Sequence, residues 1–433
     1  MPKYSRKLRK DDNGWKEWFI PFLFVIVLLR LIITCIRPYQ IDMSGYLAWS
    51  RYLAEHGTAT LYSGSGFHIV YAPFYQYCLL ITGWIAKALN LTSLIHVYLI
   101  KLWSVIFEIL GAWLILLLAK KHNRTRTGAL AALLYIINPG VFMNSSIWGQ
   151  FDPIPATMLL GCICLFEHKK PNLGALLFLV AVLTKPQSGL LVPIVLYLYF
   201  RDFRLNGQSF KRLAIGLLAG IAVYLAIVMP FYSPTPLAGK GVPSLLDPFY
   251  WLLELYTRSL QDYPYATANG FNFWTLAGGQ VQPDSYPFLG LTYAAWGFIL
   301  LAFAVIYIGY LMIRSKGSLQ SVIYGSFLIL FSAFMFMTKM HERYLLPAII
   351  FCTLAAVWQK KHIPIAALVS TCVFFNQLTL YLISFDDIYW LNRWDSRALI
   401  VAAVTLVTYI WAMAQGYYLY VRPNSDNTLK NGG

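Results

Sequence analysis

Apolar segments fill most of the chain, and short clusters of Lys and Arg separate them. Only 12% of the 433 residues are charged, whereas 58% are hydrophobic. The charged share is about half that of a typical soluble domain. Because so few charges cannot keep a folded surface of this size in water, the sequence predicts an all-α, polytopic membrane protein. This excludes a secreted domain, a disordered chain and, despite the net charge of +16, a nucleic-acid-binding protein.

The basic clusters predict the topology. They contain 22 Lys and Arg against six acids, so they account for the whole net charge of +16, and the remaining loops are neutral. By the positive-inside rule, all of the clusters and both termini are expected in the cytoplasm. The clusters lie at 1–16, 120–126, 169–170, 201–212, 314–316, 360–361 and 422–430.

About twelve transmembrane helices fit between the basic clusters, in one integral-membrane domain over residues 1–433. They are expected near 17–36, 97–119, 127–143, 153–167, 172–184, 188–200, 211–231, 287–313, 319–337, 344–359, 363–383 and 398–421.

Two long external loops result, 37–96 and 232–286. The stretch 71–89 is apolar enough to cross the membrane, but a crossing there would put the basic cluster at 120–126 outside. We therefore expect two juxtamembrane helices in the first loop, at 43–55 and 72–89, the second lying on the outer leaflet.

Polar motifs interrupt the apolar sequence at five places, and the charge-derived topology puts every one of them on the external side. Because the charge count did not use these motifs, their agreement predicts a single site on the non-cytoplasmic face. They are Ile41–Met43, Trp148–Asp152, Thr184–Gln187, Asn269–Trp274 and Lys339–Tyr344.

Taken in order, these motifs resemble those of the C-type (GT-C) integral-membrane glycosyltransferases, and most of all bacterial relatives of the second GPI mannosyltransferase. The resemblance covers roughly 17–360 and rests on the combination of Trp148–Asp152, Lys185-Pro186-Gln187 and His341–Tyr344. One departure is that relatives often have two consecutive prolines before the juxtamembrane helix, where this chain reads Tyr71-Ala72-Pro73.

The resemblance implies an inverting transfer of a sugar, with mannose the first guess, from a polyprenyl-phosphate carrier to an acceptor hydroxyl. It would occur at the outer face of a bacterial plasma membrane. Such a reaction needs one base for the acceptor proton. Cations or strong donors must also surround the departing phosphate.

The sequence offers residues for each of these roles. Asp42 and Asp152 are the candidate catalytic acids, with Asp42 preferred as the general base. Lys185, His341 and Arg343 are the candidate ligands of the donor phosphate. The candidates for sugar or acceptor binding are Trp148, Gln150, Gln187, Asn269, Asn272, Glu342 and Tyr344.

The expected partners are a polyprenyl-phosphate-linked sugar donor, a glycan, lipid or protein acceptor, and membrane lipids. No nucleic acid, resident metal or other cofactor is expected, although a divalent metal is not excluded by the sequence. The six cysteines indicate neither a disulfide framework nor a metal site.

Structural alternatives remain for several of these residues. Asp42 and Asp152 could be helix N-caps, the latter because Pro153 follows it. Lys185 could reach the membrane interface, and His341–Arg343 could be headgroup anchors. The asparagines could serve loop turns.

Two other functions compete with the glycosyltransferase: a transporter or flippase for polyprenyl-linked glycans, and a non-catalytic assembly subunit. A transporter would use ionisable groups inside its helices. Arg30 and Glu108 are the two such charges, and they are expected to pair with each other.

Overall fold

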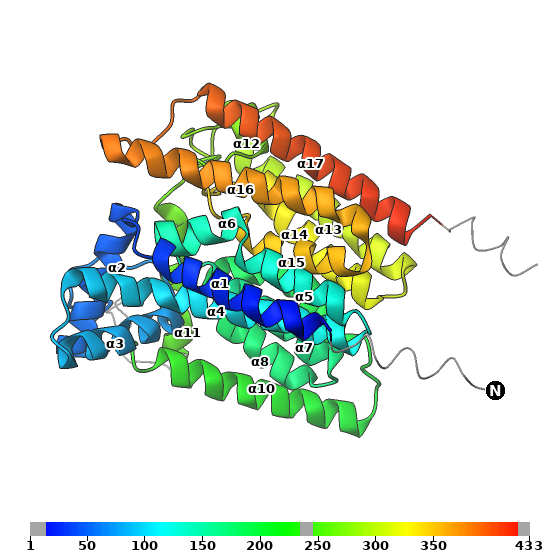
Figure 1. Cartoon of the computed structure of the whole chain (residues 1–433), viewed down its shortest axis with the longest axis horizontal. Helices are drawn as coiled ribbons and strands as arrows, with labels where there is room; N and C mark the ends of the chain where they lie inside the picture. Colours follow the sequence, from blue (N-terminus) through cyan, green and yellow to red (C-terminus); the bar gives the residue numbers. More distant parts are fainter. Residues whose placement is uncertain (1–13, 234–245, 423–433) are drawn as a thin grey trace, which may run out of the picture.

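The computed structural model describes residues 14–233 and 246–422, and most of this part is helical. The long helices run side by side in one bundle (Figure 1). The helical elements are α1 (Trp15–Ile33), α2 (Gln40–His56), α3 (Pro73–Ala88), α4 (Ser93–Lys121), α5 (Thr125–Ile136), α6 (Pro139–Phe142), the π-helix η1 (Met143–Trp148), α7 (Pro153–Glu167), α8 (Pro171–Val182), the 3₁₀ helix η2 (Pro186–Leu191), α9 (Val192–Phe200), α10 (Gly207–Val228), α11 (Asp247–Gln261), α12 (Phe273–Leu276), α13 (Tyr293–Arg314), α14 (Leu319–Phe336), α15 (Leu346–Trp358), the 3₁₀ helix η3 (Lys360–His362), α16 (Ile363–Ile383), the 3₁₀ helix η4 (Ser384–Asp386) and α17 (Ser396–Tyr420).

Each of the predicted spans corresponds to a helix. Within the described residues, seven helices are long and apolar enough to cross a membrane, four shorter apolar ones lie among them, and α1 completes the set. The short helices α7 and α15 are buried along almost their whole length by their neighbours. Because protein surrounds them, they need not meet the full thickness of the bilayer. The predicted all-α, polytopic membrane fold is confirmed.

Proline begins many of these helices. Pro73, Pro139, Pro153 and Pro171 each occupy the first position of a helix, where the missing N–H costs nothing and the ring fixes a helical φ. Pro139 also interrupts the predicted span 127–143, because a proline cannot continue the preceding helix. The chain resumes as α6 and then as the π-helix η1, which ends at Trp148.

The two loops expected outside contain more structure than the sequence predicted. In the first, α2 begins at Gln40 rather than at 43, and α3 packs against it. In the second, α11 buries one apolar face through Trp251, Leu252 and Leu255. No helix was predicted there.

The predicted start of the span 287–313 was wrong. Residues before α13 form a small antiparallel hairpin of β1 (Pro287–Phe288) and β2 (Leu291–Thr292). Its two-residue turn has positive φ at both Leu289 (46°) and Gly290 (86°), as a type I′ turn requires. Thr292 then caps α13 by accepting a hydrogen bond from the N–H of Ala295 (3.1 Å).

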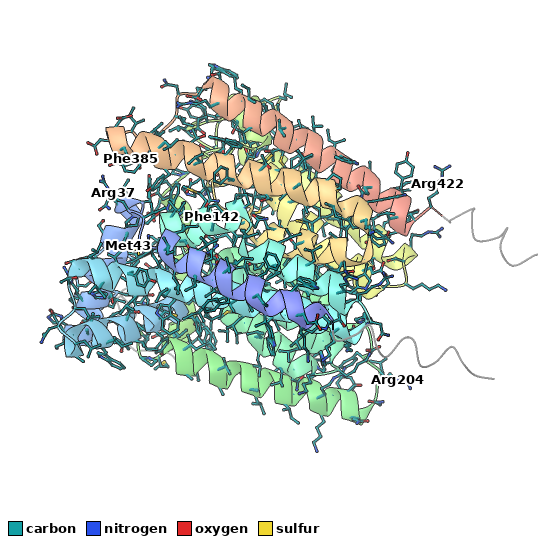
Figure 2. All side chains as sticks on the ribbon, in the orientation of Figure 1. Arg37, Met43, Phe142, Arg204, Phe385 and Arg422 are labelled. Atoms are coloured by element: carbon teal, nitrogen blue, oxygen red, sulfur yellow. The ribbon has the colours of Figure 1, made fainter. Side chains whose placement is uncertain are left out.

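The basic loops lie together at one end of the bundle. Lys121 pairs with Glu167 (3.5 Å) and Lys169 with Asp202 (3.2 Å), which joins the ends of α4, α7, α8 and α9. Figure 2 shows Arg204 and Arg422 at that end, and Arg37, Met43 and Phe385 at the opposite end. The helices α2 and α3 lie at this second end, which carries the candidate site.

Candidate active site

Asp42 lies in the first turn of α2, and its carboxylate is held by two neutral donors. The indole Nε1 of Trp148 (2.7 Å) and the amide Nε2 of Gln150 (2.6 Å) both donate to its Oδ2. The side chain is half-buried. Within the described residues, Oδ1 accepts no hydrogen bond and no Lys or Arg lies within 4.0 Å of the carboxylate. The N-cap of α2 is Tyr39, so the capping alternative for Asp42 is wrong.

Trp148 and Gln150 are themselves fixed by the protein. The ring of Tyr39 stacks on that of Trp148 at a centroid distance of 4.1 Å. The amide Oε1 of Gln150 accepts a hydrogen bond from the hydroxyl of Tyr46 (3.0 Å), so its Nε2 must face Asp42. Gly149, at φ 94°, turns the chain between the two residues.

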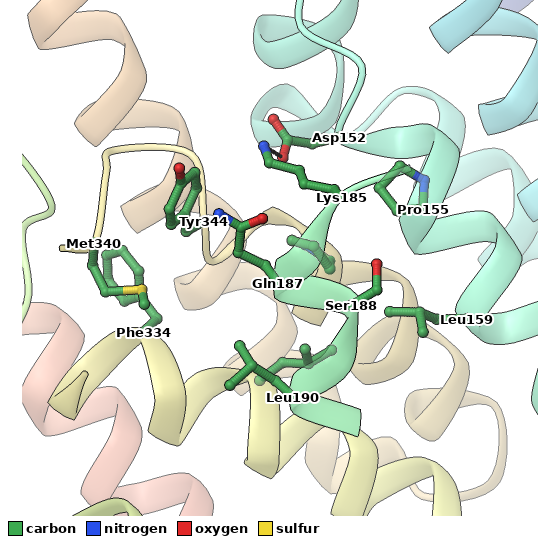
Figure 3. Close-up of a pocket in the computed structure, with 12 residues that line it drawn as sticks. Asp152, Pro155, Leu159, Lys185, Gln187, Ser188, Leu190, Phe334, Met340 and Tyr344 are labelled. Carbon is green, nitrogen blue, oxygen red and sulfur yellow. Dashed lines mark hydrogen bonds and ion pairs between the residues drawn. The ribbon is translucent and has the colours of Figure 1, made fainter. Parts of the chain in front are cut away.

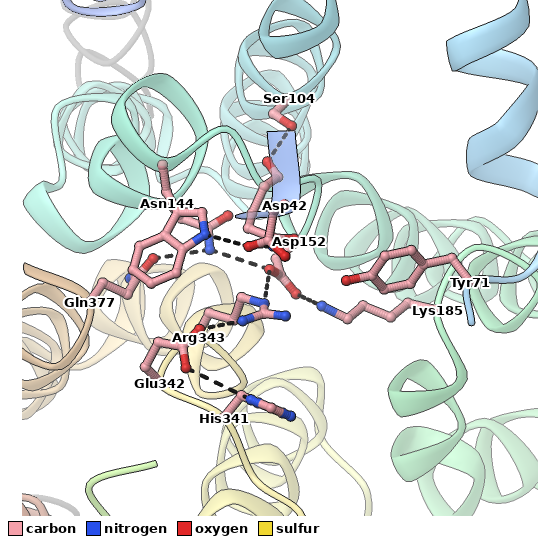
Figure 4. Close-up of polar contacts among 12 residues, drawn as sticks. Asp42, Tyr71, Ser104, Asn144, Asp152, Lys185, His341, Glu342, Arg343 and Gln377 are labelled. Atoms are coloured by element: carbon pink, nitrogen blue, oxygen red, sulfur yellow. Dashed lines mark hydrogen bonds and ion pairs between the residues drawn. The ribbon is translucent and has the colours of Figure 1, made fainter. Parts of the chain in front are cut away.

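Asp152 has the opposite environment. It is buried, and its Oδ1 is bonded to the ammonium of Lys185. The amide of Asn144 donates to Oδ2 (3.3 Å), and the guanidinium Nε of Arg343 lies 3.9 Å from the same oxygen. Although Asp152 precedes α7, it makes no capping hydrogen bond. Its carboxylate therefore serves as the counter-ion of buried cations rather than as a helix cap (Figure 4).

The loop between α14 and α15 supplies a second buried ion pair. Arg343 donates to the carboxylate of Glu342, while its Nε has no hydrogen-bond partner although it is buried. Burial alone would lower the pKa of Arg343. The negative charges of Glu342 and Asp42 outweigh this effect and raise the pKa above its usual value, so the guanidinium stays charged. Burial also raises the pKa of Glu342, and Arg343 partly offsets this increase.

His341 contributes a neutral ring to this group. Burial lowers the pKa of its imidazole well below the usual value, and the positive charges of Arg343 and Lys185 lower it further. The ring packs edge-on against Tyr263 (4.7 Å between centroids). His341 therefore donates or accepts a hydrogen bond at neutral pH but supplies no charge.

A narrow cleft begins at the Asp152–Lys185 pair and continues between η2, α14 and α15 (Figure 3). Gln187 and Tyr344 line it beside the pair, and the ring of Tyr344 lies 4.8 Å from the ammonium of Lys185. Apart from Ser188, the other walls are apolar and come from Pro155, Leu159, Leu190, Leu330, Phe334, Met340 and Pro347. The cleft thus combines a charged end with otherwise largely apolar walls.

The backbone of Asn269 lies beside that of His341, but the side chains of Asn269 and Asn272 are bonded elsewhere. The amide of Asn269 is bonded to Gln280 (2.5 Å) and to the backbone of Tyr389 (2.9 Å). Asn272 is fully buried, caps α12 and donates to the carbonyl of Phe334 (2.8 Å). These contacts favour the structural alternative, in which both asparagines shape the external loop.

Several residues that position the site were missed from the sequence. The amide of Asn144 also donates to Gln377 (3.0 Å). The ammonium of Lys101, buried in α4, donates to the carbonyls of Thr34, Ile36 and Ser146 and so ties η1 to the end of α1. Polar side chains inside apolar helices were the available signal, as in Asn376-Gln377.

The arrangement suits the transfer of a group away from a phosphate. A carboxylate without a cation stands ready to take a proton, and two cations lie near it to meet a phosphate. Within the described residues, no group of three or more His, Cys, Asp and Glu is placed to hold a metal ion. The expectation that no metal is needed stays a prediction.

Comparison with known proteins bears on the fold. No protein-family model and no curated protein matches the sequence. Among solved structures, ArnT from Cupriavidus metallidurans bound to undecaprenyl phosphate aligns over 93% of this chain and 78% of its own, at 15% identity and a TM-score of 0.51. The two proteins therefore share a fold over nearly the whole chain, in agreement with the predicted GT-C fold class.

Two further structures match with lower scores. The apo state of the same ArnT aligns over 96% of this chain and 80% of its own, at 15% identity and a TM-score of 0.49. The Archaeoglobus fulgidus oligosaccharyltransferase, tethered to an acceptor peptide, aligns over 95% of this chain and 56% of its own, at 17% identity and a TM-score of 0.42.

Proposed function

We propose that the protein is a membrane glycosyltransferase that moves a sugar from a polyprenyl-phosphate carrier to an acceptor hydroxyl. The observation that carries this proposal is the way in which the charged side chains of the site are paired. Asp42 is free of cations, whereas Lys185 and Arg343 are held nearby by acids of their own. The shared fold with ArnT, solved with undecaprenyl phosphate bound, supports the choice of donor.

In the proposed reaction the acceptor oxygen attacks the anomeric carbon from the face opposite the phosphate. The new carbon–oxygen bond forms as the bond between the anomeric carbon and the phosphate oxygen breaks. The electron pair of the broken bond leaves with the polyprenyl phosphate. Asp42 takes the proton of the acceptor hydroxyl. A phosphate is acidic enough to leave without a general acid, so the reaction needs only one base.

Asp42 is the better base of the two aspartates. Both carboxylate oxygens of Asp152 are engaged, one by Lys185 and the other by Asn144, whereas within the described residues only Oδ2 of Asp42 accepts hydrogen bonds. Its open Oδ1 can also receive the acceptor hydroxyl. Burial lowers the pKa of Lys185, and Asp152 opposes this effect and holds the ammonium in place, so we assign Asp152 a positioning role.

The donor phosphate is proposed to bind Lys185 and Arg343, with His341 as a neutral donor. Charge-assisted hydrogen bonds to phosphate are among the strong ones in proteins, and Arg343 has an unused buried Nε to offer. The walls of the cleft beyond Lys185 are mostly apolar, which is chemically compatible with the first part of a polyprenyl chain. Trp148, Gln150, Gln187, Glu342 and Tyr344 remain the candidates for sugar and acceptor contacts.

Mannose as the sugar, and an outward-facing site in a bacterial plasma membrane, are part of this proposal. The resemblance of the motifs supports the first, and the basic clusters gathered at the opposite end of the bundle support the second. The acceptor is proposed to be a glycan, lipid or protein hydroxyl.

The main rival function, a transporter, has less support from the contacts inside the helices. Arg30 and Glu108 pair with each other as expected, and Arg30 also bonds Ser145 (2.8 Å) and the carbonyl of Ile136 (3.0 Å). A pair tied down in this way is typical of helix packing. The charged residues of the candidate site, Asp42, Lys185 and Arg343, lie at one end of the molecule. This position favours a reaction at the membrane surface over transport through the bundle.

The test is donor turnover by the purified protein. Short-chain polyprenyl-phosphate mannose, glucose and galactose are each incubated with it and a membrane extract as the acceptor source, and released polyprenyl phosphate is measured. We expect release with one sugar, and release at least about a hundredfold slower with the Asp42→Asn variant. Movement of the intact donor across vesicles without release would instead identify a transporter.

A further inference from the structure

A pocket of about 600 Å³ lies at the basic end of the bundle, far from the candidate active site. It is formed by the α9–α10 loop, the start of α10 and Asn172 near the start of α8. Three cations line it: Arg204, Lys211 and Arg212. Within the described residues, none of the three pairs with an acid.

The one acid in the pocket does not neutralise these cations. Asp202 is 58% exposed and lies 3.2 Å from Lys169 and 3.8 Å from Arg201, so it is already paired. The pocket lining therefore carries uncompensated positive charge. A basic surface loop would be fully hydrated, so the partial burial of one of these cations is the informative feature.

Arg212 is half-buried, and two of its guanidinium nitrogens are fully covered. Its guanidinium lies 5.7 Å from the ring centroids of both Tyr199 and Phe203, which hold it in place. Its Nε and Nη2 are buried and have no hydrogen-bond partner. Unpaired buried donors of a charged group are costly, so their arrangement points to a ligand that accepts hydrogen bonds.

The surroundings of the pocket favour a ligand with an acyl chain. Ile215 lines the pocket and is 51% exposed, and Leu218 on the next turn of α10 is 68% exposed. In α10 only Ser209, Tyr224 and Val228 are buried, so most of this helix faces away from the bundle. A phosphate in the pocket would therefore have apolar surface directly beside it.

We propose that this pocket binds the phosphate of an anionic phospholipid, with the acyl chains lying along α10. Cationic pockets between helices at the cytoplasmic end are suited to such headgroups. The positive end of the α10 dipole adds to the attraction. The site is independent of the proposed catalytic function, and its test measures binding rather than turnover.

The experiment uses the purified full chain in neutral detergent. Dioctanoyl phosphatidylglycerol is titrated, with dioctanoyl phosphatidylcholine and inorganic phosphate as separate arms. The shift in melting temperature gives the apparent Kd, and native mass spectrometry counts bound lipids. We expect phosphatidylglycerol to stabilise the protein at concentrations where the other two compounds do not.

Variants locate the binding. Arg212→Gln is expected to weaken phosphatidylglycerol binding about tenfold or more, as the loss of a charge-assisted contact implies. The triple variant, in which Arg204→Gln and Lys211→Gln are added to Arg212→Gln, should bind phosphatidylglycerol more weakly still. Lys360→Gln, an exposed cation of η3 outside the pocket, is the matched control and should bind as the wild type does.

Several results of these binding measurements would contradict the proposal. A folded triple variant that binds phosphatidylglycerol like the wild type would overturn the site, as would an equal loss in Lys360→Gln. If inorganic phosphate stabilises the protein as well as the lipid does, the lipid assignment is wrong. Should Arg212→Gln fail to fold, the exposed Arg204 and Lys211 still decide, since unchanged binding in both single variants contradicts the proposal.

Discussion

Asp42 accepts hydrogen bonds from an indole and an amide, whereas Asp152 is bonded to an ammonium. The same side chain thus has two different chemical environments. Replacement of each aspartate by asparagine removes the negative charge while keeping the shape. The contrast between the two variants should therefore separate proton transfer from the stabilisation of a buried cation.

The first prediction concerns these two variants. Asp42→Asn cannot take the acceptor proton, so kcat should fall by about 10² to 10⁴. Its melting temperature should change little, because the asparagine oxygen can still accept the hydrogen bonds of Trp148 and Gln150. Steady-state kinetics and a thermal melt check both values.

Asp152→Asn provides the comparison. It leaves Lys185 buried without its counter-ion, and the loss of one partner of a buried pair costs about 3–5 kcal/mol. Its melting temperature should therefore fall clearly, and a larger share of kcat should remain than in Asp42→Asn. Wild-type turnover in Asp42→Asn, with none in a folded Asp152→Asn, would exchange the roles of the two residues.

The second prediction concerns the three proposed phosphate ligands. Lys185→Gln and Arg343→Gln should each raise the KM for the donor about ten- to a hundredfold, because each loses a charge-assisted contact. His341→Gln should raise it by less than about tenfold, since the imidazole is neutral. An effect of His341→Gln equal to that of Arg343→Gln would mean that the bound donor protonates the ring.

The third prediction follows from the lowered pKa of His341. Above about pH 6.5 the imidazole is neutral in both the folded and the unfolded chain, so it has no effect on the pH dependence. Below that pH the unfolded chain takes up a proton that the folded chain resists, and stability is lost. The wild type should therefore lose more melting temperature than His341→Gln between pH 7.5 and 5.5, and equal losses would contradict the burial of a neutral ring.

Close approach of α3 to α2 depends on Gly83. A Cβ at this position would run into the backbone oxygen of Ser50, which leaves no space for any other residue. Because α2 carries Asp42 in its first turn, the α2–α3 contact supports the candidate base from the opposite end of the helix. The helices α2 and α3 thus form one structural unit.

The fourth prediction tests this contact. Gly83→Ala should lower the melting temperature and the activity, because the clash involves backbone that cannot move aside. Gly220→Ala in α10 is the control, since no atom lies within 4 Å of the Cβ it would add. The control should keep full stability, with a gain of up to about 1 kcal/mol from helix propensity. Equal behaviour of the two variants would show that α3 is not packed as described.

Apolar runs and prolines were sufficient to predict most elements. The predicted bounds 153–167 and 363–383 are those of α7 and α16. The π-helix η1 was not predictable from its local sequence, and its contacts include distant ones such as that between the ammonium of Lys101 and the carbonyl of Ser146, 45 residues away. The hairpin before α13 was hidden by the apolar character of Pro287–Leu291, which also suits a helix.

The sequence predicted that the motifs of the site lie together, but it did not predict which of their side chains pair with one another. Charge patterning placed Asp42, Asp152, Lys185 and Arg343 at one end of the bundle. That Lys185 binds Asp152 while Asp42 binds none of the cations is set by tertiary packing. A short motif such as Asn269–Asn272 also does not reveal that its side chains are hydrogen-bonded to other parts of the protein.

The fifth prediction concerns sidedness of the whole molecule. Single cysteines at 285 and 89 should react with an impermeant thiol reagent applied to intact cells, and one at 205 should not. The background should lack Cys35, the one native cysteine that is exposed. Labelling at 205 would reverse the topology, and protection at 89 alone would mean that α3 crosses the membrane.

The ion pair between Arg30 and Glu108 has a consequence for biogenesis. The chain is synthesised from its N-terminus at roughly 5–20 residues per second, so Glu108, 78 residues later, follows Arg30 after about 4 to 16 s. During that interval α1 contains a cation that hydrocarbon penalises by about 2.5–3.5 kcal/mol. We therefore expect nascent α1 to wait at the insertion machinery until α4 emerges, so that the two helices enter the lipid as a pair.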